Sequence, residues 1–178
     1  KKRGSSSTMG DFKIVFDVPD LIFSVGGSIV SFMILAWAHS QLAAHNITAM
    51  CPPLGAVAVL LFAAPAAVPS KPYNTAFGFL IGSAAAFAIY TAVGEGFLKE
   101  FGGTRALMVG AAIAGMKITN SVHPPAGAYA VLLADVPAIK ALGWKYILFP
   151  GLSGALILLV CQFLVMQLKG AVSKQKKA

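Results

Sequence analysis

The sequence predicts an all-α polytopic membrane protein built from two tandem repeats. Of its 178 residues 57% are hydrophobic and only 11% are charged, and the mean hydropathy is +0.78. Soluble domains carry roughly 25% charged residues, and a soluble chain of this length has no interior large enough to hide so much apolar surface. The same composition excludes a disordered chain. The length allows one domain of a few membrane spans and no separate soluble catalytic domain.

Three stretches are long and apolar enough to cross a bilayer. They are residues 21–44, 73–94 and 146–168. The first, with Pro19 and Asp20 as start signals, would be ~36 Å long as a helix, against a hydrocarbon core of ~30 Å. In the second, Gly78 and Gly82 form a GxxxG packing face. A fourth stretch, residues 104–116, is apolar but shorter, so we expect about four full spans in all.

Two shorter blocks, residues 52–64 and 124–134, are copies of one another. The sequence CPPLGAVAVLL at 51–61 matches HPPAGAYAVLL at 123–133, with eight of eleven positions identical at an offset of 72. The same offset places Phe77, Leu80 and Gly82 on Phe149, Leu152 and Gly154. A match held in register over this distance indicates an internal duplication.

The duplication divides the chain into four parts. Residues 1–20 form a basic tail and an interfacial segment, 21–94 the first repeat, 95–168 the second, and 169–178 a basic tail. Basic residues that flank apolar blocks are typical of membrane proteins. Nucleic-acid binding would need a folded basic surface with aromatic or polar side chains that contact bases, and the sequence does not indicate one. The basic, Ser-rich start is interpreted as the stub of an organellar targeting peptide, which favours a chloroplast membrane. A trimmed bacterial terminus, and so a bacterial inner membrane, is the alternative.

The short blocks leave two arrangements open. Each is preceded by a seven-residue connector, 45–51 or 117–123, which reaches ~23 Å when extended. A helix of ~12 residues then covers ~18 Å, so connector and helix could form a re-entrant hairpin beside four full spans. Six crossings are the alternative. Either way ten of the 14 basic residues lie on one side, and segment length favours four spans with two re-entrant helices.

Short helices at corresponding positions of two repeats indicate a transporter binding site. Unpaired amides at their first turns carry partial positive charge and would suit a small anion. The candidate substrate-binding side chains lie near these starts: His45, Thr48, Cys51, Lys117, Asn120, Ser121 and His123. The turns themselves are set by Pro52, Pro53, Gly55, Pro124, Pro125 and Gly127.

Each candidate also has a purely structural interpretation. Lys117 could snorkel to an interface, and His123 could cap its own turn or orient the site in its neutral form. Asn120 and Ser121 could cap the second short helix, and His39 is expected to be packed and hydrogen-bonded. Tyr129 could line a pore or fill the core. No catalytic constellation, metal-ligand spacing or phosphate-binding loop is present, so we expect no enzyme activity, metal or cofactor.

The chain resembles the HPP family of small integral membrane proteins over roughly residues 21–168. The resemblance is carried by PLGAVAVLLF at 53–62, Pro72-Tyr73-Asn74, HPPAGA at 123–128 and GALILL at 154–159. It implies a four-spanning protein, and some photosynthetic members are associated with nitrite movement across the plastid envelope. Family members tend to have a Gly-Gly pair where this chain has Ala126-Gly127. They also tend to have Arg at the position of Tyr73, and the nearest basic residue in this chain is Lys71.

These observations predict transport of a small inorganic anion, with nitrite the leading candidate. The alternative is a non-transporting membrane subunit docked into a larger, for example photosynthetic, assembly. In that case His39 or His45 could be an axial ligand to a tetrapyrrole. The small-residue faces would serve a homo-oligomer or a larger complex equally well.

Overall fold

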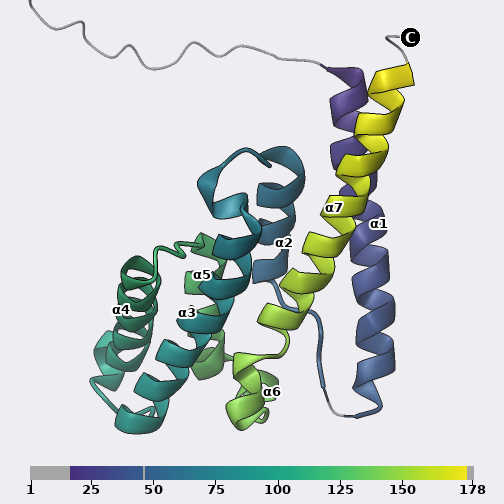
Figure 1. The fold of residues 1–178 in the computed structure, drawn as a ribbon. Coiled ribbons are helices and arrows are strands. Elements are labelled where there is room, and N and C mark those ends of the chain that lie inside the picture. The colour runs from purple at the N-terminus through teal and green to yellow at the C-terminus, as the bar shows by residue number, and fades with distance from the viewer. Residues whose placement is uncertain (1–16, 46, 176–178) are drawn as a thin grey trace, which may run out of the picture.

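The computed structural model describes residues 17–45 and 47–175, and all of its elements in this part of the chain are helical (Figure 1). The first basic tail up to residue 16, on which the targeting-peptide interpretation rests, lies outside the described residues, and so do residues 176–178.

The longest helices are α1 (Val18–Ala43), α3 (Pro72–Val93) and α7 (Gly151–Gln175). The others are α2 (Pro53–Ala58), α4 (Gly103–Ile118), α5 (Pro124–Asp135) and α6 (Pro137–Lys140). A π-helix, η1 (Val59–Ala63), extends α2, and three 3-10 turns complete the path: η2 (Val68–Ser70), η3 (Lys99–Phe101) and η4 (Gly143–Ile147).

Three of these helical segments are long and apolar enough to cross a membrane. They are Val18–Ala43, Pro72–Val93 and Gly143–Ser173, the last combining η4 with α7. The all-α membrane class predicted from the sequence is confirmed. The fourth apolar stretch forms α4, whose 16 residues make a helix of about 24 Å, short of a full hydrocarbon core.

Helix boundaries follow local chemistry more closely than hydropathy. α1 begins at Val18 because the Asp17 carboxylate caps it, accepting from the Asp20 amide at 3.3 Å. Within the third span the regular helix α7 begins at Gly151 and not at Tyr146, directly after Pro150, because proline cannot occupy a helix interior. Tyr146 lies instead in η4, with its side chain buried.

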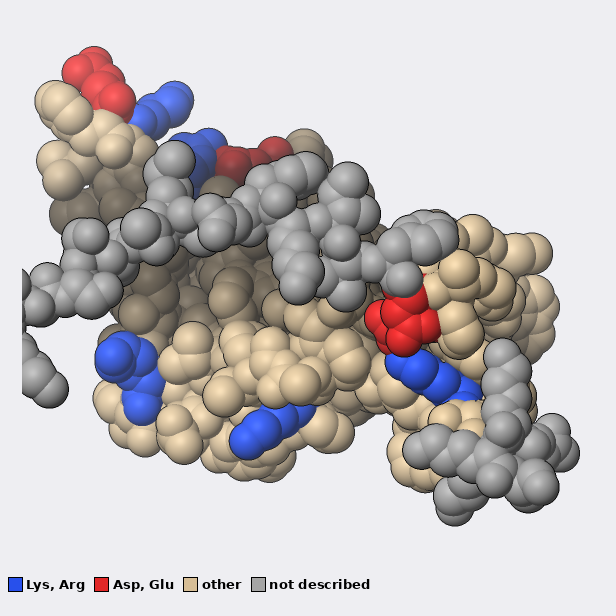
Figure 2. Space-filling model, turned by 90° about the horizontal axis from the view of Figure 1, so that it is seen from above, with Lys and Arg blue, Asp and Glu red and all other residues tan. Residues whose placement is uncertain are grey.

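The chain path alternates between two ends of the molecule. Figure 1 shows α1 descending, the connector after it rising to α2, and α2 continuing upward. Ion pairs join Lys169 to Asp20 at one end, and Arg105 to Asp135 at the other. Seen from the end where α1 begins, the surface is mostly uncharged, and acidic side chains lie next to basic ones in small groups (Figure 2).

This path differs from the hairpin expected for the first short helix. The lengths of connector and helix, ~23 Å and ~18 Å, also suffice for one broken crossing when both run in the same direction. Segment length alone therefore could not distinguish a return from a continuation.

The helix contacts form two matching sets. α7 packs on α1 and α2, α3 packs on α4 and α5, and α2 also contacts α5. A Cβ added at Gly82 would lie 3.4 Å from the Ala126 Cβ, and one at Gly154 would overlap Leu54 Cδ1. These two contacts are related by the same offset of 72 residues that relates the sequence repeats, with the partners exchanged between halves.

Side-chain hydroxyls add hydrogen bonds to backbone carbonyls of the π-helix η1 and of the turn that follows it. Ser70 Oγ lies 2.8 Å from the Leu60 oxygen and 2.7 Å from the Ala64 oxygen. Ser24 Oγ on α1 donates to the Phe62 oxygen at 2.7 Å. The Leu60 and Ala64 oxygens also accept from the Ala64 and Ala67 amides, at 3.2 Å and 3.0 Å, so Ser70 is a second donor to carbonyls that the backbone already pairs.

Candidate functional site

His123 stands at the break between α4 and α5 and has no exposed surface. Its Nδ1 lies 2.8 Å from the carbonyl oxygen of Pro69 in η2. A carbonyl only accepts, so Nδ1 carries the proton and the neutral ring presents a lone pair at Nε2. Nε2 is buried and has no hydrogen-bond partner. His123 therefore fixes the second break to the loop that ends the first short helix, and it does not cap its own turn.

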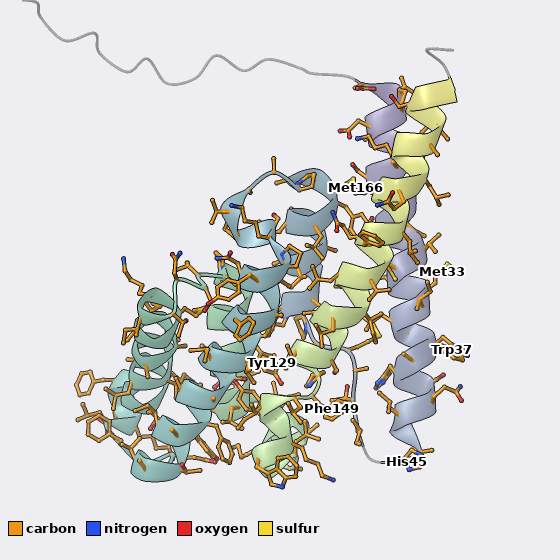
Figure 3. All side chains as sticks on the ribbon, in the orientation of Figure 1. Met33, Trp37, His45, Tyr129, Phe149 and Met166 are labelled. Atoms are coloured by element: carbon orange, nitrogen blue, oxygen red, sulfur yellow. The ribbon has the colours of Figure 1, made fainter. Side chains whose placement is uncertain are left out.

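Aromatic rings extend from His123 into the core. Its ring lies 5.3 Å from that of Phe79, which lies 5.6 Å from Tyr129. Tyr129 stacks on Tyr146 at 4.6 Å, and its hydroxyl lies 2.9 Å and 2.7 Å from the Tyr146 and Phe149 oxygens. Tyr129 is fully buried among these groups (Figure 3). It fills the core and does not line an open pore.

The connector before His123 is held by side chains of α3 and by its own hydroxyls. Tyr73 donates to the Thr119 oxygen at 2.8 Å, and Asn74 donates one amide proton to the Val122 oxygen at 3.2 Å. The Thr119 hydroxyl donates to the Gly115 oxygen at 2.9 Å and lies 2.7 Å from the Ser121 hydroxyl. Ser121 is therefore the donor of that pair, and neither hydroxyl has a proton to spare.

The first break, around Cys51, is more open. Cys51 is half-buried and lines a groove of about 350 Å³ with Phe32, Met50, Pro52 and Gly55. The connector is tied to α1 by His39, whose Nδ1 accepts from the Ala49 amide at 3.3 Å. The Thr48 hydroxyl lies 3.4 Å from the same nitrogen. His39 is thus packed and hydrogen-bonded, as the sequence predicted.

The expectation of free amides at the starts of the short helices is wrong. Pro124 and Pro125 have no N–H, and the next amide, that of Ala126, donates to the His123 oxygen at 3.0 Å. At the first break the amides of Leu54 and Gly55 donate to the Cys51 and Pro52 oxygens. The prolines that start each helix remove the donors that would have cradled an anion.

The predicted site residues separate into a buried and an exposed group. Ser121, His123, Pro53 and Pro125 are buried, and Thr48, Cys51, Gly55 and Gly127 are half-buried. The exposed group is His45, Pro52, Lys117, Asn120 and Pro124. His45 lies at the lower end of α1, away from Tyr129 (Figure 3). Asn120 adopts a left-handed turn (φ 51°). Neither it nor Ser121 occupies the N-cap position of α5, which is held by His123 without a capping hydrogen bond from its side chain.

A second polar feature lies where α3 and α5 end and α4 begins. A pocket of about 180 Å³ is lined by Glu95, Lys99, Thr104 and Arg105, among others. Glu95 pairs with Lys140 at 2.6 Å and accepts from the Tyr90 hydroxyl at 2.6 Å. The hydrogen bond from Lys140 and that from Tyr90 lower the pKa of the Glu95 carboxyl. This end of the bundle is closed by ion pairs between helices.

Sequence reasoning missed several groups around His123. Phe79 and Tyr146 carried no signal, because aromatic residues in apolar spans are ordinary. The Pro69 carbonyl could not be found, because the side chain says nothing about a backbone oxygen 54 residues away. Asn74 could have been found, since a polar amide at the start of an apolar span needs a partner.

Comparison with known proteins places the chain in one family. The family model described as "HPP, transmembrane region" matches residues 14–175. A curated transmembrane protein of Dictyostelium discoideum is 30% identical over 151 residues, which are 84% of this chain and 48% of that protein. A second from the same organism is 28% identical over 150 residues, 84% of this chain and 52% of the relative.

Both relatives are named only as transmembrane proteins, and the chain spans about half of their length. No solved structure matches. Since the family model covers nearly the whole chain, from just before α1 to the end of α7, this protein belongs to the HPP family of transmembrane proteins.

Proposed function

We propose that this protein carries a small inorganic anion across the membrane along the junction of α2 and α5. The observation that carries the proposal is the contact of these two short, proline-initiated helices with each other and with α7 and α3 respectively. Interrupted helices that meet between two repeats are the usual location of substrate sites in transporters. Nitrite is the first anion to test, on the family resemblance.

We further propose that the two halves are inverted repeats, in which connector and short helix together make one broken crossing. The offset of 72 residues relates not only sequence but also the contacts Gly82–Ala126 and Gly154–Leu54. The alternation of helix direction in Figure 1 supports six crossings, with the start of α1 and the end of α7 on one side.

The occupied amides change how an anion would be recognised. The donors near the second break are the unused amide proton of Asn74 and, when protonated, His123. Lys117 is exposed on α4 and would act at the entrance to the path and not within it. The groove at Cys51 provides an opening at the first break.

Flux into proteoliposomes holding the purified protein tests the proposal. Nitrite, nitrate, chloride and formate are compared with empty liposomes, and we expect selective uptake. A small methanethiosulfonate reagent should lower the flux through Cys51. The Cys161→Ala variant should remain sensitive to it, and any flux of Cys51→Ala should be insensitive.

The Ser40→Ala variant changes an exposed position of α1, and it controls for effects of mutation, purification and reconstitution that are unrelated to the proposed path. Folded protein with no flux above empty liposomes would contradict transport and favour a subunit of a larger assembly.

A further inference from the structure

We propose that His123 takes up a proton together with the transported anion, so that the two cross the membrane as a neutral pair. The inference rests on the proposed function and adds the chemistry of its site. It starts from Nε2 of His123, the one buried side-chain nitrogen or oxygen among the described residues that has no hydrogen-bond partner. Such atoms are rare in folded proteins because an unmade hydrogen bond in the interior is costly, and each calls for an explanation.

The other donors near His123 are already engaged. The Thr119 and Ser121 hydroxyls form a chain that ends on the Gly115 oxygen. Proline removes two amides at the start of α5, and Ala126 uses the next. The Tyr129 hydroxyl donates to backbone oxygens. In this state the site offers an anion one amide proton of Asn74 and a lone pair at Nε2, which would repel it.

No charged group compensates an anion at this depth. The side chain that faces the His123 ring is Phe79 from α3, with Tyr129 from α5 and Tyr146 from η4 behind it. Asn74, also from α3, donates to the carbonyl oxygen of the preceding residue, Val122. Its remaining neighbour is the Pro69 carbonyl from η2, and from the α4 connector the polar groups are Thr119 and Ser121. Among the described residues no Asp, Glu, Lys or Arg is buried. An unpaired ion there would be strongly disfavoured.

A proton at Nε2 replaces the lone pair that would repel an anion, and it supplies the positive charge that would compensate one. An N–H bond forms at Nε2 with a proton from water on the entry side, and the cationic ring then donates to the anion while Nδ1 keeps its bond to Pro69. On the exit side that N–H bond breaks, the proton returns to water with the anion, and His123 is neutral again. One proton and one anion move per cycle, and no net charge crosses.

The test measures nitrite uptake at pH 7.5 into proteoliposomes, with the leak of nitrous acid into empty liposomes subtracted. Potassium gradients with valinomycin set the membrane potential, and a trapped dye reports internal pH. We expect the same uptake at 0 and at about −100 mV, where a lone anion would be strongly affected. The interior should gain one proton per nitrite.

Variants test the assignment to His123. The His123→Gln variant keeps a polar side chain but no basic nitrogen, and its uptake should fall about tenfold or more, equivalent to about 1.4 kcal/mol per tenfold. His39→Gln changes an imidazole on α1 that holds only the first connector, and its uptake should stay independent of potential. Size-exclusion chromatography checks that both variants fold.

The outcomes separate the two proposals. Uptake that depends on potential, without acidification, overturns the role of His123 and leaves transport standing. Folded wild-type protein without uptake overturns both. If His123→Gln does not fold, the proposal of a neutral pair is decided on the wild-type protein, by the dependence of uptake on membrane potential and by the acidification of the interior.

Discussion

At the scale of single residues, Gly78 decides how closely α3 approaches the second break. A Cβ at this position would lie 2.5 Å from the His123 Cβ and 2.8 Å from the Ser121 oxygen. At Gly82, one turn further along α3 and also buried, the nearest atom would be 3.4 Å away. Two glycines of one GxxxG face therefore have different roles, one set by a steric limit and one by ordinary packing.

We expect Gly78→Ala to lower the free energy of unfolding by about 1–3 kcal/mol, the usual cost of overpacking a core. Gly82→Ala should be neutral or stabilising, because alanine favours a helix by about 1 kcal/mol over glycine. Thermal unfolding in detergent compares the two. Equal midpoints for both variants would contradict the steric role of Gly78.

At the scale of elements, the π-helix η1 depends on a side chain outside it. The buried Ser70 hydroxyl lies within hydrogen-bond distance of the Leu60 and Ala64 oxygens, which also accept from the Ala64 and Ala67 amides. Ser70→Ala should lower the free energy of unfolding by about 0.5–1.5 kcal/mol, the usual net contribution of one intramolecular hydrogen bond. Ser40→Ala, which removes an exposed hydroxyl bonded within its own helix, should change it by under about 0.5 kcal/mol. Chemical unfolding followed by circular dichroism measures both, and an equally small loss in the two variants would show that η1 needs no support.

The contact between the end of α3 and α6 should depend on pH. The Lys140 ammonium and the Tyr90 hydroxyl hold the pKa of the Glu95 carboxyl below its usual value. The folded pKa is lower than the unfolded value of about 4.3, so the pair stabilises the fold above that pH, and the effect is lost as pH falls through the folded pKa.

Glu95→Gln should therefore lower the unfolding midpoint at pH 7 and make less difference near pH 3. Glu100→Gln is the matched control, because Glu100 lies in the same loop and forms no ion pair within the described residues. A Glu95→Gln effect of the same size at both pH values would exclude the ion pair as its cause.

At the scale of the whole molecule, the number of crossings decides which loops share a side. Six crossings place Lys71 on the side of Ser173 and Lys99 on the opposite side, and four spans reverse both assignments. Single cysteines at these three positions, in a background without Cys51 and Cys161, are labelled with an impermeant maleimide from one side of sealed vesicles. We expect 71 and 173 to label together and 99 to be protected. Joint labelling of 99 and 173 would restore the re-entrant arrangement.

The sequence by itself determined the membrane class, the existence of the long helices and the position of the short ones. Apolar composition, span length and proline at the start of a helix are local properties, and they act before any tertiary contact forms. The sequence also predicts a duplication, because a match such as PPxGAxAVLL is held in register at an offset of 72 residues. Boundaries moved by a few residues where a cap at Asp17 or a proline at 150 overrode hydropathy.

Only the tertiary structure decided which groups are buried and which are exposed at the two breaks. The short helices look alike in sequence. Yet His123 is buried, with its ring bonded to the Pro69 oxygen and packed on Phe79, while Cys51 lines an open groove. The direction of α2, the engaged amides and the exposure of Lys117 likewise depend on which segments pack together. Contacts between a backbone oxygen and a side chain 54 residues apart leave no periodic trace in a sequence, because a carbonyl has the same chemistry at every position.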